Sequence, residues 1–323
     1  MASEKQHAAN DSLTLPSYAP ELQHTPTQHR KNANKKLLTA IVLSFSVLAV
    51  TQLPVREALL RGYDATSSPS STFAPPLGFP ERIQRRWGQY SPYFPAGDYV
   101  PPPTGCEITQ VNILQRHGAR YPNDDDDYDL AVKHLRHAKE YRDSGLDFLK
   151  DYEYQLKVDV LVPYGAEQSF ESGEAAYKRY SHLVSETNIP FVRAASKPRV
   201  VASAGNWTVG FAAASHHHYN PPLALILPES RNNTLNNECP AASDGLAEAH
   251  KWLRVFAPSI VERLHKSAKG SKVTEEDIHR LMALCPFETL AHERPSPFCG
   301  LFSDEEFRAL EYFGDVEKYY KTG

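Results

Sequence analysis

The stretch CEITQVNILQRHGARYP, residues 106–122, joins a run of β-branched and apolar residues to a short loop that contains two arginines and one histidine. Such a run is typical of a β-strand, and Gly118 and Pro122 then turn the chain and end the strand pattern. Open α/β sheets bind ligands in the loops at the carboxyl ends of their strands. The stretch therefore predicts an α/β fold with its site in residues 115–122.

The same loop has the composition of an anion site. Arg116 and Arg120 can both face one phosphate group, because guanidinium groups donate paired, charge-assisted hydrogen bonds to its oxygens. Two permanent cations disfavour a third, so we expect His117 between them to be neutral and able to attack phosphorus. An isolated Arg-His-Gly triplet is usually a surface turn. The longer motif, placed after a strand, instead favours a nucleophile inside a phosphate clamp.

The motif and several later segments resemble the histidine acid phosphatases, and most closely the fungal-type phytases of that family. The segments that carry the resemblance are RHGARYP, LVPYGAEQSFESGEAAYKRY, IPFVRAASKPRVVASAGNWTVGF, NNTLNNECP, LCPFETL and SPFCGLF. The resemblance implies that His117 attacks the phosphomonoester and forms a phosphohistidine. It implies further that Arg116, Arg120 and Arg199 bind the phosphate oxygens, and that no metal or organic cofactor is needed.

The resemblance also implies a phosphoglycerate-mutase-like three-layer α/β sandwich, in which helices cover a mostly parallel sheet and a smaller helical domain is inserted. We place the α/β part in residues 104–228 and the helical insert in residues 229–323. In the family, the chain returns after the insert to complete the sheet. We therefore expect the sheet of this chain to lack strands and to expose an apolar face and an edge.

The family's second active-site motif is a His-Asp pair whose aspartate protonates the leaving oxygen. No His-Asp pair occurs in the 323 residues. The nearest imitation is His292-Glu293, which falls in what resembles a loop of the helical domain. We therefore identify no general acid in this sequence, and we expect a chain that is truncated relative to the family.

The four cysteines fit an oxidising, lumenal compartment, and their spacing is not that of a zinc site. The resemblance implies a local disulfide between Cys285 and Cys299. In the family, the counterparts of Cys106 and Cys239 pair with cysteines near the C-terminus, which this sequence does not contain. A truncated chain or an incomplete gene model would leave this pattern.

The N-terminal region contains a candidate membrane segment, residues 37–55, which has 19 residues without a charge. We expect residues 1–36 to be a disordered cytoplasmic tail and residues 56–103, rich in Pro and Ser, to be a stalk. The basic residues before the segment predict that the chain after it is lumenal or extracellular. A cleaved signal peptide, and hence secretion, is the alternative.

Glycosylation sequons, the net charge, a run of histidines and a run of acidic residues bear on the location and on the ligands of the chain. Asn206 and Asn232 begin glycosylation sequons. The net charge of −4 does not suggest nucleic acid as a partner. We expect the histidines at 216–218 to be solvated rather than to bind metal. The acidic run at 123–129 is expected to be a solvated loop, with calcium binding as the lesser alternative because its spacing is not that of an EF-hand. Its carboxylates are expected to weaken binding of the polyanion phytate.

These observations predict a phosphomonoester hydrolase of the acid phosphatase or phytase type, acting on phytate or on smaller monoesters, although this chain is expected not to turn over every substrate alone. One alternative is a membrane-anchored remnant that binds phosphate without catalysis. A phosphoglycerate-mutase-like transferase shares the histidine and the arginines, but it fits poorly with lumenal disulfides.

Overall fold

The computed structural model describes residues 77–123, 127–230, 235 and 243–322. The chain divides into the units Met1–Ser68 and Pro69–Gly323, and every described residue belongs to the second. The expected cytoplasmic tail and membrane segment, residues 1–55, lie outside the described residues. Within the described ranges, no helix has the length and apolar composition needed to cross a membrane.

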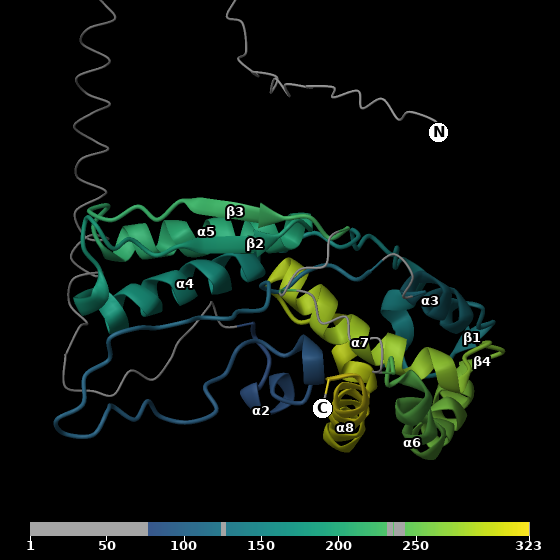
Figure 1. Ribbon diagram of the computed structural model, residues 1–323. Coiled ribbons are helices and arrows are strands. Elements are labelled where there is room, and N and C mark those ends of the chain that lie inside the picture. Colours follow the sequence, from purple (N-terminus) through teal and green to yellow (C-terminus); the bar gives the residue numbers. More distant parts are fainter. Residues whose placement is uncertain (1–76, 124–126, 231–234, 236–242, 323) are drawn as a thin grey trace, which may run out of the picture. The chain divides into compact units, whose positions relative to one another are not determined.

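A helical part makes up the larger share of these residues, and α7 is its central helix (Figure 1). α7 is buried on most of its surface and contacts α3, α6 and α8, so that its leucines fill the core. The helices are α2 (Glu81–Gln84), α3 (Tyr128–Arg136), α6 (Leu246–Ser267), α7 (Glu275–His292) and α8 (Asp304–Thr322), with 3₁₀ turns at Gly88–Tyr90, Ser144–Lys150 and Pro297–Leu301. The strands β1 (Glu140–Tyr141) and β4 (Ala268–Lys269) pair antiparallel. The helical part is therefore not confined to the predicted insert, because α2 and α3 precede residue 229.

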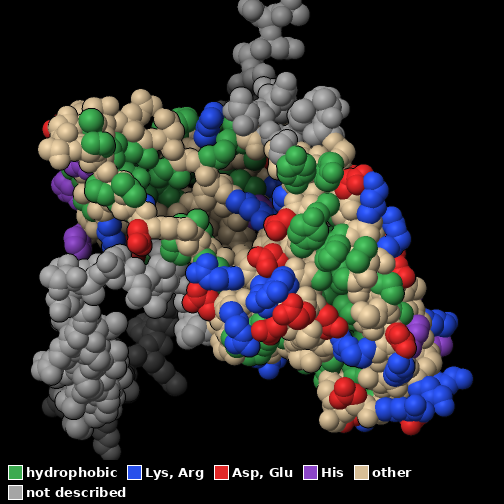
Figure 2. All heavy atoms as spheres, turned by 90° about the horizontal axis from the view of Figure 1, so that it is seen from below, with side chains coloured by type: hydrophobic (Ala, Val, Ile, Leu, Met, Phe, Trp, Pro, Cys, Tyr) green, Lys and Arg blue, Asp and Glu red, His purple; other side chains and the backbone are tan. Residues whose placement is uncertain are grey.

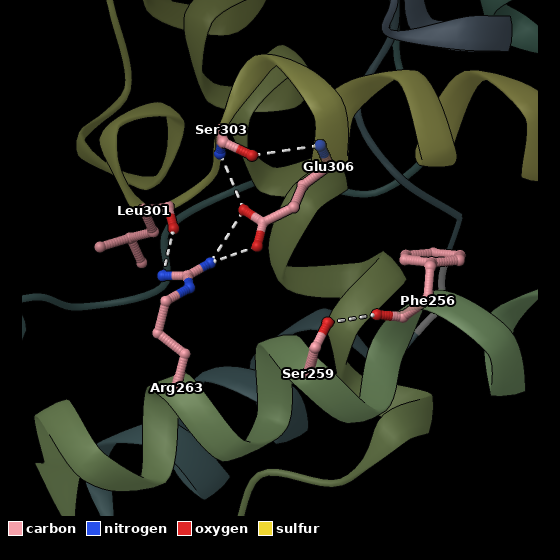
Figure 3. Close-up of polar contacts among 6 residues, drawn as sticks. All are labelled: Phe256, Ser259, Arg263, Leu301, Ser303 and Glu306. Atoms are coloured by element: carbon pink, nitrogen blue, oxygen red, sulfur yellow. Dashed lines mark hydrogen bonds and ion pairs between the residues drawn. The ribbon is translucent and has the colours of Figure 1, made fainter.

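A capping box starts α8 and ties it to α6 (Figure 3). The Ser303 Oγ accepts a hydrogen bond from the backbone N–H of Glu306 at 3.3 Å, and the Glu306 carboxylate accepts one from the backbone N–H of Ser303 at 2.8 Å. Arg263 on α6 donates through one nitrogen to both Glu306 oxygens, each at 2.8 Å, and through another to the Leu301 carbonyl at 3.0 Å. One guanidinium group thus holds the start of α8 against α6.

Residues 77–90, which we predicted to lie in a stalk, belong instead to the folded part. Leu77, Ile83 and Trp87 are almost completely buried in the same core as α7 and α8. Ile83 lies in α2, and Trp87 stands directly before the 3₁₀ turn Gly88–Tyr90, so the two side chains bury this segment against the helical part. The stalk was predicted from the Pro- and Ser-rich composition of residues 56–103, in which the three apolar residues that pack into the core are a small minority. The part of the stalk before Leu77 lies outside the described residues.

The α/β part contains α4 (Pro163–Tyr180), β2 (Val192–Ala195), α5 (Pro198–Ala214) and β3 (Leu223–Leu227), with a 3₁₀ turn at Ser181–Leu183. β2 and β3 pair in parallel, α5 contacts both strands, and α4 runs alongside α5 (Figure 1). Each helix begins at a proline, whose fixed φ suits the first helical position. Glycines allow the two helices to approach closely. A Cβ on Gly173 would lie 2.0 Å from the Trp207 carbonyl oxygen.

The strand predicted for residues 106–114 does not form. Residues 106–114 pair with no strand in the described part of the chain, and Ile113 and Leu114 are 52% and 86% exposed. A strand needs a neighbour to take its backbone hydrogen bonds, so its residue pattern alone does not produce one. The described parallel sheet has two strands, and Ile226 of β3 is also exposed. Hydrophobic side chains reach the surface on the face shown in Figure 2 as well.

The predicted disulfide between Cys285 and Cys299 is confirmed, and it joins α7 to the 3₁₀ turn that follows. Cys106 is exposed and forms no disulfide with a described residue. Asn206 lies within α5, where its side-chain amide donates to the Ala202 carbonyl at 2.9 Å. Cys239 and Asn232 lie outside the described residues.

Candidate active site

The loop that carries the candidate nucleophile is held by backbone hydrogen bonds to the segment that leads into α4. The backbone N–H of Tyr121 donates to the Val160 carbonyl at 2.9 Å, and that of Val162 donates to the Ala119 carbonyl at 3.0 Å. The backbone N–H of Asp159 donates to the Pro122 carbonyl at 2.8 Å. Residues 119–122 and 159–162 therefore form a short antiparallel pair that fixes the loop at the start of α4.

Two glycines allow the loop and the first turn of α4 to touch. A Cβ on Gly118 would lie 2.0 Å from the Gly165 carbonyl oxygen, and a Cβ on Gly165 would lie 2.0 Å from the Ala119 carbonyl oxygen. The loop also binds side chains of both neighbouring helices. The Ala119 N–H donates to Gln168 of α4 at 3.0 Å, and the Gly118 N–H donates to the hydroxyl of Ser203 of α5 at 3.0 Å. Gln168, Ser203 and Gly165 are contributors that the sequence pattern did not single out.

His117 is half-buried, and its hydrogen bond leaves one ring nitrogen for chemistry. Its Nδ1 lies 2.8 Å from the Gly118 carbonyl oxygen. A carbonyl can only accept, so Nδ1 carries the proton and Nε2 keeps its lone pair. Burial, and then the charges of Arg116, Arg199 and Arg120, lower the pKa of His117 to about 4, although the Gly118 carbonyl acts in the opposite direction. His117 is therefore a neutral imidazole at pH values above about 4.

The three predicted arginines lie close enough together for each to lower the pKa of His117. Arg116 donates through Nη1 to the Gln89 carbonyl at 2.9 Å, and Arg120 donates through Nη1 to the Tyr121 carbonyl at 2.7 Å. Arg199 stands at the start of α5. The structure thus brings all four predicted side chains together.

Asp159 is an acidic residue of this site that the sequence analysis missed. Its carboxylate accepts a hydrogen bond from Nη1 of Arg199, and its other oxygen lies 3.9 Å from Nε of Arg120. In the sequence it is one carboxylate in the apolar run VDVLVP. The backbone of Asp159 is left-handed, with φ 58°, and the apolar pattern around it does not predict this conformation.

In the described part of the chain, no carboxyl group is one of the main causes of the shift in the pKa of His117. Glu293 ends α7 in a left-handed conformation and is exposed. It lies near enough to Tyr164 to contribute, after burial and Glu171, to raising the pKa of that tyrosine to about 12. It does not figure among the groups that shift the pKa of His117. Among the described residues, no group of three His, Cys, Asp or Glu side chains is arranged to hold a metal ion.

The depressed pKa of His117 can be tested by NMR. We expect the Cε1–H signal of His117 to titrate near pH 4. Replacing Arg199 with Gln is expected to raise the midpoint, because it removes a positive charge that disfavours the imidazolium ion. The exposed His182 provides the control within the same spectra. A midpoint for His117 near the ordinary value of about 6.5 would contradict the clamp of cations.

Comparison with known proteins gives consistent matches. The family described as the histidine phosphatase superfamily (branch 2) matches residues 107–323. Phytase A of Aspergillus oryzae is 33% identical over 310 residues, which are 89% of this chain and 65% of that protein. Phytase A of Arthroderma benhamiae is 39% identical over 300 residues, which are 86% of this chain and 61% of that protein. The chain thus spans less than two thirds of the length of these relatives.

A solved structure supports the fold. The crystal structure of the phytase from D. castellii matches with a TM-score of 0.61 and 22% sequence identity, over 75% of this chain and 58% of that one. The family match covers more than half of the chain and includes the loop, α4 and α5 described above. The chain belongs to the histidine phosphatase superfamily, branch 2.

Proposed function

We propose that the chain is a phosphomonoester hydrolase of the histidine acid phosphatase or phytase type, with His117 as its nucleophile. The observation that carries the proposal is a neutral imidazole surrounded by three arginines, with its Nδ1 proton committed to the Gly118 carbonyl. Nε2 is then the atom with an available lone pair. A nucleophile and a cationic clamp are the two components that phosphoryl transfer from an ester to a protein requires.

The proposed reaction has two steps. Nε2 of His117 attacks phosphorus, a P–N bond forms, and the P–O bond to the leaving alcohol breaks with its electrons remaining on that oxygen. Arg116, Arg120 and Arg199 bind the phosphoryl oxygens as their charge redistributes. Water then attacks phosphorus and a P–O bond forms, while the P–N bond breaks and its electrons return to Nε2. The protons of the water stay on the released inorganic phosphate, and His117 is neutral again. No metal or organic cofactor takes part in this scheme.

The substrates and the location also belong to the proposal. The relatives are phytases, so the substrate class is a phosphomonoester, either phytate or a smaller ester. Residues 37–55 would anchor the chain in a membrane and leave the site lumenal or extracellular, or the chain would be secreted if this segment were removed. The disulfide between Cys285 and Cys299 suits either location.

Trapping of the intermediate tests the proposal. Brief incubation with radiolabelled p-nitrophenyl phosphate is expected to label the protein with a phosphoryl group that survives alkali and is lost in acid, as a phosphohistidine is. His117→Ala should carry no label, whereas the exposed control His182→Ala should be labelled like the wild type. Label that persists in His117→Ala would refute the assigned nucleophile. A chain that binds inorganic phosphate but takes up no label would support the alternative of a non-catalytic phosphate-binding protein.

A further inference from the structure

The three arginines of the site share a mode of attachment. Arg116, Arg120 and Arg199 are each held through Nη1, by the Gln89 carbonyl, the Tyr121 carbonyl and the Asp159 carboxylate respectively. A guanidinium group has five N–H donors in a fixed plane, so one anchored nitrogen orients the rest. Two of the anchors are backbone carbonyls. Arg199 alone depends on a side chain, and that side chain carries a charge.

Asp159 serves two arginines at once. One carboxylate oxygen binds Arg199, and the other lies 3.9 Å from Nε of Arg120, a distance that allows an ion pair but no hydrogen bond. That oxygen, Nε of Arg120 and Nε of Arg199 are buried and make no hydrogen bond with any described residue. Buried donors without partners are costly unless a ligand satisfies them. Asp159 hydrogen-bonds to one nitrogen of Arg199 and to none of Arg120, so it leaves terminal N–H groups of both arginines for an anion.

The backbone fixes the position of this carboxylate. Asp159 is in the left-handed region, with φ 58°, and its N–H donates to the Pro122 carbonyl. The next residue, Val160, accepts a hydrogen bond from Tyr121. The Cα of Asp159 thus belongs to the same short antiparallel pair that holds the loop of His117, and its carboxylate is oriented by Arg199 and Arg120.

We propose that Asp159 is a positioning residue, which holds the guanidinium groups of Arg120 and Arg199 side by side so that both can bind one phosphate group. The inference rests on the proposed function and assigns a role within it. Two adjacent cations repel each other, and a carboxylate between them offsets that repulsion in the empty site. Because Asp159 uses only Nη1 of Arg199, it need not leave when phosphate arrives.

The test is a 31P NMR titration with inorganic phosphate at about pH 6. Asp159→Asn is the sharpest variant, because Asn tolerates a left-handed backbone and retains the shape while losing the charge. We expect Asp159→Asn to weaken phosphate binding about tenfold, the lower end of the range for a hydrogen bond between charged groups. Asp147→Asn, which removes an exposed carboxylate paired with Lys150, is the matched control and should bind as the wild type does.

A double-mutant cycle separates positioning from general support of the fold. In an Arg199→Gln background, Asp159→Asn should weaken binding further by only about twofold or less, because its main partner is already gone. A full tenfold loss in that background would show that the effect does not depend on the contact with Arg199, and would overturn the inference that Asp159 positions the two arginines together. Unchanged or tighter binding by Asp159→Asn alone would also overturn it, the latter by showing that Asp159 competes with phosphate.

Two further measurements keep the result interpretable. Thermal unfolding identifies a variant that folds poorly, and Asp159→Gly, which also accepts a left-handed backbone, then takes the place of Asp159→Asn. A wild-type chain that does not bind phosphate would refute the proposed function itself, and this inference with it. Binding by the wild type that is insensitive to Asp159 would refute the inference alone.

Discussion

p-Nitrophenyl phosphate is expected to be hydrolysed by the 323-residue chain at least about 10²-fold faster than glycerol phosphate, near pH 5. A positioned general acid contributes about 10²- to 10⁴-fold, and an alkoxide needs it far more than a nitrophenolate does. The sequence contains no His-Asp pair. Among the described residues, Asp159 is paired with Arg199, while the charge of Glu317 acts on Arg116 and that of Glu229 acts on Arg199. No carboxyl group among these residues is one of the main causes of the shift in the pKa of His117. Both esters need the same nucleophile and clamp, so their ratio of kcat/KM reports on the acid.

Two variants define this experiment. His117→Ala should abolish turnover of both esters, which shows that the measured hydrolysis belongs to this site. Glu293→Gln should leave the ratio unchanged. Equal rates for the two esters, both lost in His117→Ala, would contradict the prediction and show that an acid is present. Glu293 is then the first candidate, because it lies near Tyr164 at the start of α4, and its replacement should slow glycerol phosphate selectively.

Gly165→Ala is expected to lower kcat/KM for p-nitrophenyl phosphate by about 10²-fold. The added Cβ would lie 2.0 Å from the Ala119 carbonyl oxygen, so the loop has to move by an ångström or so. A misplacement of about 1 Å can cost about 10²-fold in rate. Overpacking of backbone against backbone should also destabilise the fold by about 1 to 3 kcal/mol, which a shift in the unfolding midpoint would report.

Gly205→Ala is the matched control for this substitution. Gly205 lies within α5, as Gly165 lies within α4, but a Cβ at Gly205 has no neighbour within 4 Å among the described residues. The control should be as active as the wild type and slightly more stable, because Ala favours helix over Gly by about 1 kcal/mol. Equal activity of the two variants would show that the close approach of loop and helix is not needed for catalysis.

Residues with strong local chemistry were predictable from the sequence. The Arg-His-Gly-Ala-Arg motif led to His117, Arg116 and Arg120, and the resemblance of residues 189–211 to a segment of the histidine acid phosphatases led to Arg199. The structure brings these four side chains together, although their catalytic roles stay a prediction. Cys285 and Cys299 were also paired correctly. In each case a charged or reactive side chain marked the position, and the family resemblance provided the distant partner.

The other features of the fold and the site depend on contacts between segments far apart in the sequence, and the sequence of one segment does not show such contacts. Residues 106–114 have the composition of a strand, but strand formation needs a neighbouring backbone, and none of the described residues provides it. Asp159 reads as one acid in an apolar run, and its role follows from a left-handed backbone and from two arginines 39 and 40 residues away. Gly165 is needed because the loop of His117 packs against it. The sequence of α4 alone does not predict that contact.

The burial of Trp87 beside α8 changes where a domain boundary should be drawn. The family match begins at residue 107, yet Leu77, Ile83 and Trp87 already belong to the core, and the Gln89 carbonyl anchors Arg116. A polypeptide shortened to the family match would expose the surface that these side chains cover and release one arginine of the site. A protease that cuts after Leu77 would therefore remove part of the core, whereas a cut before Leu77 leaves all three buried side chains in the folded part.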